Sequence, residues 1–487
     1  MPTALVNDSL PWPLYPTLAA LLLRLQLVQD CWHLLAGRRE HYLPRGEREP
    51  ESAYRRRVEA ALPSGFFRDA LRTFAGMLAS SHWRELPATL QAVISDVDGC
   101  GTDLGVFLEA ADLAVLRDGA ALVGVIPPAH LWPSEGDRQQ ALRNGDRLSL
   151  PRLLLIKRGD VLHWHLPGIH ALPDAITWRE RCPNAFTPSN LLSTPIGVNQ
   201  AAPQPELPPH PFQYLTASLV ADGPGGAGMD LTSETVVADP QCPSGWRKQR
   251  IHQHHYRGIN QLPAIWYASH GAAFGEGELP HLGLAHQYLN HLRCQSDYQE
   301  LLYRTALPVG VRTGVAGPMG SSSASEPVVL GPNSVIDLPE GASFQFVEIQ
   351  ARSLAEHRAW LESLDQGMRR DALIPAVAQG APRTAMEISM AASQAYALLQ
   401  SQAIQKASMF SSLLQHWCAI TGEPLAKWDG ANGTGPALTV EISPLAPAPK
   451  PQPTVSEMLQ LQERGIISEQ ALRQWLGDLA GIYPAST

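Results

Sequence analysis

The most regular hydrophobic pattern in the chain lies between residues 384 and 422. Thr384 and Glu387 form a T-x-x-E capping box, a pair whose side chains accept backbone N–H groups at the start of a helix. From Ile388 to Trp417 apolar residues largely keep helical spacing, and the positions between them are mostly Ser, Gln and Ala. Lys406 is the only formally charged residue in that stretch. The pattern predicts one long helix that is too polar for a membrane and nearly free of charge.

A helix on the solvated face of a monomer normally carries charged residues. If continuous, this helix would be roughly 50 Å long at about 1.5 Å per residue. We therefore interpret it as an assembly helix that is buried among protein neighbours. Its small residues let neighbouring helices approach closely, and we expect Ala391, Ala395 and Leu398 at the contact between subunits. The alternative is that it forms the core helix of a large monomer.

The first 90 residues have a mainly helical pattern. Two helices are predicted on either side of Pro63-Ser64-Gly65, because these residues interrupt the periodicity. One apolar stripe runs along both helices and consists of Tyr54, Val58, Ala61, Phe66, Phe67, Leu71, Phe74 and Leu78.

Residues 104 to 170 have a mixed pattern. Helical spacing covers residues 104–116, and the continuous apolar run Ala120–Ile126 predicts a buried strand. Residues 153–166 are predicted to form a β-hairpin whose turn is Lys157-Arg158-Gly159-Asp160. Helices and strands therefore both contribute to this part of the chain.

Later segments add a loop and a second helical unit. Residues 195–235 are rich in Pro and Gly and are predicted to form a loop, with a mobile part at 223–228. Two helices at 280–305 and 353–374 enclose a strand-rich insert at 308–350. Within that insert, apolar runs at Val328 to Leu330 and Phe344 to Ile349 are the predicted strands. Five prolines at 444–453 predict an extended linker, and short helices are predicted beyond it. The fold class is α+β.

Composition narrows the classes of function. A chain of 487 residues can form two to four domains. A formal net charge of −9 argues against wrapping nucleic acid by bulk attraction, but it allows a neutral or acidic channel through which DNA slides. The six cysteines include no C-x-x-C pair, which is typical of free thiols in a reducing compartment. Arg24 interrupts the apolar run Leu18–Leu27, so no membrane span is predicted. The N-terminal segment has Asp8 and no early basic residue and therefore does not resemble a secretory signal. The protein is expected in a cytoplasm or in a particle assembled there.

One acidic motif could carry catalysis. Asp96-Val97-Asp98-Gly99 resembles the nucleophile loop of haloacid-dehalogenase-type phosphatases, in which both aspartates bind magnesium. Cys100 stands where that motif has Thr, and no downstream acidic pair lies in the right context. The better interpretation is a polar turn that precedes the helix from Leu104.

Histidines could in principle hold a metal ion. His163 and His165 would share one face of a strand, and His252, His254 and His255 lie close together. No paired Cys and no carboxylate at ligand spacing accompanies them. We therefore predict no metal site, no cofactor and no catalytic residue.

A family resemblance rests on the order and spacing of short motifs over most of the chain. The motifs are Tyr54-x-x-Arg57, Phe74-Ala75-Gly76, Asp98-Gly99, Leu116-Arg117-Asp118-Gly119, Leu262-Pro263, Ser296-Asp297, Leu307-Pro308, Leu330-Gly331-Pro332, Leu338-Pro339-Glu340-Gly341 and Thr384-Ala385-x-Glu387. Together they resemble tailed-bacteriophage portal proteins, in particular a divergent portal-like family of phages and prophages.

The resemblance implies an architecture of wing, stem, clip and crown. The implied segments are 1–90 as the N-terminal helical part of the wing, 91–279 as the α/β wing, 280–306 as stem helix 1, 307–351 as the clip, 352–375 as stem helix 2, 376–384 as the tunnel loop, 385–443 as the long helix and wing return, 444–453 as the Pro-rich linker and 454–487 as a small helical crown.

The resemblance also implies a function without catalysis. Portal proteins form a dodecameric ring at one capsid vertex, through which double-stranded DNA is packaged and ejected. The implied partners are further copies of the chain, the terminase large subunit, a neck or adaptor protein and the major capsid protein. Within the tunnel loop, Gln379, Gly380, Arg383 and Thr384 are candidates for the constriction, where Arg383 could contact a phosphate or merely end the loop. Another head or neck structural protein, or a magnesium-dependent phosphatase using Asp96 and Asp98, stays open as an alternative.

Overall fold

The computed structural model describes most of the chain, with gaps. The described residues are 14–47, 49–83, 86–128, 136–137, 140, 146, 149–168, 171–181, 212–222, 226–239, 241, 246–271, 273–306, 309–313, 343–347, 353–372, 385–424, 438–440, 442 and 462.

A three-stranded antiparallel sheet lies at the centre of the body. β2 (Ala120–Ile126) is its middle strand and pairs with β3 (Arg152–Lys157) and β9 (Ala264–Ala268). Helices α6 (Leu104–Asp118) and α10 (Ala385–Thr421) pack their apolar side chains into one core with the odd-numbered residues of β2. The predicted helix from Leu104 and the predicted strand at 120–126 are confirmed.

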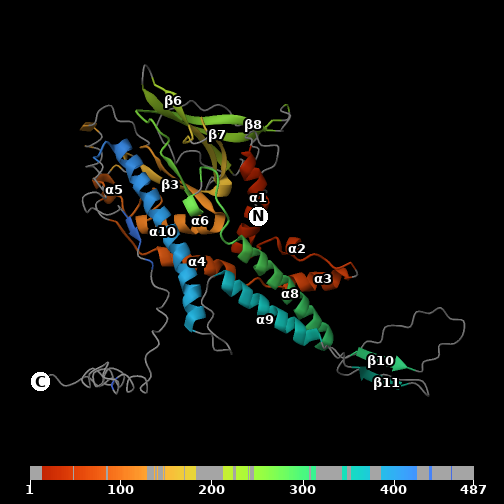
Figure 1. Cartoon of the computed structure of the whole chain (residues 1–487). Coiled ribbons are helices and arrows are strands. Elements are labelled where there is room, and N and C mark those ends of the chain that lie inside the picture. The colour runs from red at the N-terminus through yellow and green to blue at the C-terminus, as the bar shows by residue number, and fades with distance from the viewer. Residues whose placement is uncertain are drawn as a thin grey trace.

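A second, five-stranded antiparallel sheet covers the other face of the first (Figure 1). Its strands, in the order β4-β5-β6-β7-β8, are β4 (Val161–His165), β5 (Ala175–Arg181), β6 (Phe212–Ala221), β7 (Ala227–Ala238) and β8 (Trp246–Arg257). Leu122 and Ile156 of the first sheet share a buried core with Trp178, Leu215 and Met229 of the second. The body therefore consists of a helical layer and two sheets.

Two predictions for this region are wrong. Residues 153–166 do not form a hairpin, because β3 pairs with β2 while β4 pairs with β5 in the other sheet. Between them Arg158 is buried and donates to the carbonyl oxygens of Gly275 and Gly277, so the chain is held where it crosses from one sheet to the other. The predicted loop at 195–235 contains β6 and most of β7, which pair from Tyr214↔Glu234 to Ala221↔Ala227; residues 182–211 and 223–225 lie outside the described part.

The N-terminal region is helical, as predicted. It contains α1 (Pro16–Trp32), α2 (Arg39–Tyr42), α3 (Glu51–Ala60), α4 (Phe66–Leu78) and α5 (Ala88–Ala92), and the short strand β1 (Ser81–Trp83) pairs with β12 (Leu438–Val440). The predicted stripe is largely buried: Val58, Ala61, Phe67 and Leu71 lie in one core with the base of α8 (Leu282–Ala306).

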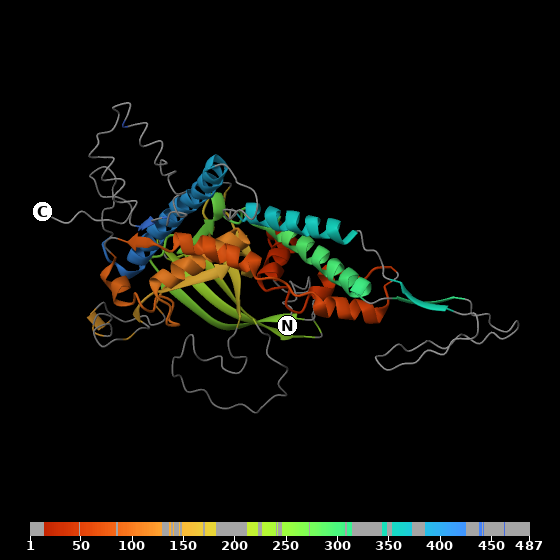
Figure 2. The ribbon, with the colours of Figure 1, turned by 90° about the horizontal axis from the view of Figure 1, so that it is seen from below.

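A long helical pair extends away from this body. α8 runs antiparallel to α9 (Ser353–Asp371), and both project beyond the sheets toward the two-stranded ribbon of β10 (Val309–Thr313) and β11 (Ser343–Val347) (Figures 1 and 2). We call α8, α9 and this ribbon the arm. The two predicted helices are confirmed, and β11 lies where a strand was expected; the predicted strand at 328–330 lies outside the described residues.

Gly119 sets the turn between α6 and β2. It has φ +78° and ends α6 by donating its N–H to the carbonyl of Val115. A Cβ atom there would collide with the backbone carbonyl of Glu278. Gly422 ends α10 in the same way with φ +72°, but has open space around its Cα hydrogen.

We expect Gly119→Ala to destabilise the protein more than Gly422→Ala. Both variants incur the left-handed backbone strain, of about 1 kcal/mol or somewhat more, but only Gly119→Ala adds a clash with fixed backbone. Urea denaturation of the two variants measures the difference in the free energy of unfolding. Equal losses would show that the Glu278 backbone moves aside freely.

Candidate functional site

The base of the arm is fastened to the N-terminal helices. Tyr288 donates its hydroxyl hydrogen to the carbonyl of Ser64 at 2.6 Å, and Arg293 donates to the carbonyl of Tyr42 at 2.9 Å. Gln287 of α8 donates to Asp371 of α9 across the helical pair. These contacts lie where α8 is largely buried, so the base of the arm is fixed to the body.

Helix α9 of the arm carries exposed ion pairs. On α9, Arg358 pairs with Glu362 at 3.1 Å and Arg369 pairs with Asp365 at 2.8 Å, each one helical turn apart. Such exposed pairs stabilise a helix only slightly. Trp360 is 56% exposed on the same helix. This side of α9 is therefore hydrated and charged, with one exposed aromatic side chain.

A cleft of about 620 Å³ lies between α3 and α8. Arg57 binds Glu49 at its wall through two hydrogen bonds of 2.8 and 2.9 Å. Asp297, Glu300 and Arg293 also line the cleft, so both signs of charge are present. This mixed lining favours neither a polyphosphate nor a metal ion.

Helix α10 differs on its two sides. One side is part of the core: Leu399, Phe410, Leu413, Leu414 and Trp417 are all at most 2% exposed. The core-helix alternative is therefore correct for this side of α10.

The other side of α10 faces outward and carries no charge in its described part. The exposed residues between 396 and 421 are Tyr396, Ala397, Leu398, Gln400, Ile404, Ser408, Gln415 and Ala419. We call this set the neutral face of α10. Ile404 is 62% exposed and Leu398 is 47% exposed, so an apolar surface is open to a partner.

Lys406, the lone charge between Glu387 and Glu423, is buried. Its Nζ lies 2.7 Å from Oδ2 of Asp112 in α6, and the two side chains are 1% and 0% exposed. Nζ also donates to the carbonyl of Leu78 at the end of α4, 2.8 Å away. Tyr267 of β9 donates to the other oxygen of Asp112 at 2.6 Å, and Gln402 donates to the Tyr267 hydroxyl at 2.8 Å. One network thus joins α4, α6, α10 and β9.

Burial and hydrogen bonding shift the acidities in this network. Burial raises the pKa of the Asp112 carboxyl above its usual value, while the charge of Lys406 opposes that shift. Burial, together with the neighbouring Asp112, also raises the pKa of Tyr267 well above its usual value. The charge state of each titratable group therefore depends on its partner. The role of this network is structural: it holds the four elements together.

The acidic motif at 96–99 forms a turn. Asp98 accepts the N–H groups of Cys100 at 2.8 Å and Thr102 at 3.3 Å, and Asp96 accepts that of Gly101 at 2.8 Å. Partial burial raises the pKa of Asp98, but hydrogen bonds from Thr102 and Cys100 outweigh it and hold the pKa below its usual value. Asp103 then caps α6. The predicted polar turn is confirmed, and both carboxylates serve the loop backbone.

The histidines are dispersed among separate partners. His165 lies 2.6 Å from Asp174, His255 lies 2.7 Å from Asp230, and the ring of His163 lies beside that of Tyr15. Among the described residues, no group of three or more His, Cys, Asp or Glu is arranged to hold a metal ion.

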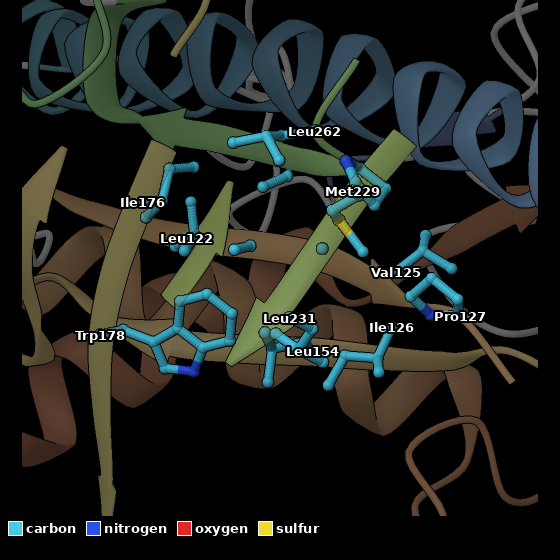
Figure 3. Close-up of a pocket in the computed structure, with 14 residues that line it drawn as sticks. Leu122, Val125, Ile126, Pro127, Leu154, Ile176, Trp178, Met229, Leu231 and Leu262 are labelled. Atoms are coloured by element: carbon cyan, nitrogen blue, oxygen red, sulfur yellow. The ribbon is translucent and has the colours of Figure 1, made fainter. Parts of the chain in front are cut away.

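An apolar cavity of about 30 Å³ lies between the two sheets (Figure 3). Leu122, Trp178, Met229, Leu231 and Leu262 point into it from both sheets. An apolar cavity of this size stays dry and offers no group to orient a substrate. It is a packing defect between the sheets.

The residues proposed from the sequence for the tunnel and the interface have different positions. Gln379, Gly380, Arg383 and Thr384 lie outside the described residues, between α9 and α10. Ala391 and Ala395 lie within helix α10, as expected, and Leu398 is on its neutral face. Asp112 and Tyr267 were missed, although a single charge in a long neutral helix is itself a signal of a buried ion pair.

None of the described helices combines the length and apolar character needed to cross a membrane.

Comparison with known proteins gives one family match. Residues 280–420 match a family described as "Domain of unknown function (DUF4055)". The matched span runs from the start of α8 through α9 and nearly to the end of α10. A search of curated proteins finds no match.

Several solved structures are similar to the chain over most of its length. A chain of "Virion of native gene transfer agent (GTA) particle" has 13% identity and a TM-score of 0.38, covering 92% of this chain and 99% of that chain. A chain of "Neck of empty GTA particle computed with C6 symmetry" has 13% identity and a TM-score of 0.39, covering 90% and 95%. A chain of "Neck of native GTA particle computed with C12 symmetry" has 14% identity and a TM-score of 0.37, covering 89% and 94%.

We expect Lys406→Met to destabilise the protein by about 3–5 kcal/mol, because it leaves the Asp112 carboxylate buried without a counter-charge. The double variant Asp112→Leu/Lys406→Met should recover much of that loss, since it removes both charges. Urea denaturation at fixed protein concentration measures both effects. A loss below about 1 kcal/mol in Lys406→Met would show that water reaches the pair.

Proposed function

We propose that the chain is the subunit of a portal ring, a dodecamer at one capsid vertex through which double-stranded DNA enters and leaves the particle. The observation that carries this proposal is the arm: an α/β body is followed by α8, a two-stranded ribbon, α9 and the long α10. This is the order that the sequence resemblance implies for wing, stem, clip, stem and returning helix.

Under this proposal, each segment has a part in the portal plan. α8 and α9 are the two stem helices, and β10 with β11 belongs to the clip. The body formed by the N-terminal helices and the two sheets is the wing, to which α10 returns. The proposed linker at 444–453 and the proposed crown at 454–487 lie, apart from residue 462, outside the described residues.

The tunnel loop is the segment between α9 and α10. Because α9 ends at Asp371 and α10 begins at Ala385, residues 376–384 must connect the two helices. Gln379, Gly380, Arg383 and Thr384 are the proposed constriction. DNA that slides needs weak contacts without sequence preference, and Arg383 can supply a phosphate contact of that kind.

The proposed role is structural. Other copies of the chain, the terminase large subunit, a neck or adaptor protein and the major capsid protein are the proposed partners. The binding of Asp96 and Asp98 to their own loop supports a structural role over phosphatase chemistry.

The direct test is the mass and shape of the purified protein. We expect light scattering to give the mass of about a dozen chains of 52.9 kDa and negative-stain images to show rings with a central hole. Small closed oligomers without a hole would instead favour a different head or neck component. Monomers at every concentration, with no rings in the images, would contradict the proposal.

We expect Ala391→Glu and Ala395→Glu each to hinder ring formation, because a subunit contact would bury an unpaired carboxylate. Light scattering of each variant at the concentration that assembles the wild type measures the effect. Ala221→Glu, at the exposed end of β6, is the matched control and should assemble normally. Rings that form normally from both α10 variants would refute the contact at these positions.

A further inference from the structure

Three helices lie in a row across the helical side of the body. α6 is in the middle: Asp112 faces Lys406 of α10 on one side, and Arg117 lies over the ring of Trp32 in α1 on the other. In Figure 1, α10 crosses one end of α6, and α1 lies beyond the other end. The two outer helices therefore form opposite flanks of the chain.

The orientation of α10 is fixed by its buried ion pair. Ile404 precedes Lys406 by two residues, which is roughly 200° around a helix with 3.6 residues per turn. Since Lys406 points toward α6, Ile404 points away from it, at the centre of the neutral face of α10.

The opposite flank has a similar surface on α1. Leu25 is 2% exposed and lies against Gly159, while Leu23, two residues earlier, points outward and is 82% exposed. Ala19 and Ala20 are also exposed one turn before Leu23. We call Ala19, Ala20 and Leu23 the neutral face of α1; Arg24 lies at its margin.

We propose that the neutral face of α10 in one copy packs against the neutral face of α1 in the next copy. This inference rests on the proposed ring and names the surfaces that close it. A contact between two different faces of the same chain is heterologous, and repetition of such a contact around an axis generates a ring.

The chemistry of the two faces matches. Neither carries a charge that would lose its hydration on contact, so burial incurs no ionic desolvation cost. The neutral face of α1 has Leu23 beside two alanines, and that of α10 has Ile404 together with Leu398 and Tyr396. Both are apolar, and their small residues allow close helix approach. Arg24 can stay hydrated at the rim, where interfaces are polar.

The arm is the weaker candidate for this contact. Trp360 and Tyr303 are exposed there, but Trp360 lies on a helix with several charged residues, and Arg56 covers the Tyr303 ring at 4.1 Å. The neutral faces leave fewer charges to be desolvated.

A charge-swap experiment tests the contact. Leu23→Lys and Ile404→Glu each place one charge in the proposed interface, and each should raise the protein concentration at half assembly by at least about tenfold. The double variant places Lys opposite Glu at every interface and should assemble better than either single variant. Leu172→Lys, at an exposed leucine outside both faces, is the matched control and should assemble as the wild type does. Both sites are exposed, so urea denaturation should show that the monomers fold.

Disulfide trapping gives a second measurement. In a Cys100→Ser background, which removes an exposed native thiol, Leu23→Cys with Ile404→Cys should yield a ladder of linked chains on non-reducing gels. A disulfide requires Cα atoms within about 7 Å of each other, so only a close contact between copies can form it. Leu172→Cys with Ile404→Cys should give no ladder.

The outcomes separate the two proposals. Wild-type rings together with single variants that assemble normally, or with no ladder, would overturn the contact between α1 and α10 while leaving the ring in place. A double variant that assembles no better than the single variants would also overturn the contact. A wild-type chain that never assembles would overturn both the contact and the proposed function.

Discussion

The buried ion pair between Lys406 and Asp112 determines how the helical side of the body is arranged. A charge in a dry interior is tolerated only when a counter-charge and hydrogen bonds meet it. Here Asp112, the Leu78 carbonyl and the Tyr267 hydroxyl supply them from three different elements. Helix α10 therefore cannot rotate or slide without leaving a charge unpaired, which fixes its register against α4, α6 and β9.

That fixed orientation decides which residues of α10 meet solvent. With Lys406 inward, Phe410 and Trp417 enter the core and Ile404 faces out. Between residues 396 and 421 the only charge is that of Lys406, and it is paired inside the chain, so the outward side of this stretch is neutral. The ion pair that fixes α10 to the body therefore also leaves the outward side of α10 neutral. For such a surface, contact with protein is more favourable than contact with water.

The parts predicted correctly from the sequence are those whose pattern is local. The strand at 120–126 is a continuous apolar run, and α8 and α9 have clear helical spacing. The five-stranded sheet was largely missed because β6 and β7 lie in a Pro- and Gly-rich region, whose composition favoured a loop over strands. The false hairpin at 153–166 arose because the change of sheet at Arg158 depends on carbonyl groups far away in sequence. The partner of Lys406 was missed for the same reason, because it lies far away in the sequence.

The surfaces of the arm and of α10 suit different kinds of contact. Obligate interfaces are more apolar than transient ones, which keep more polar and charged groups. The described part of α9 carries several ion pairs within one helical turn, whereas the neutral face of α10 carries none. Under the proposed portal role, copies of the chain would stay together while partners at the arm are exchanged. The charge distribution supports that proposed division, with permanent contacts at the neutral faces of the body and replaceable contacts along the charged arm.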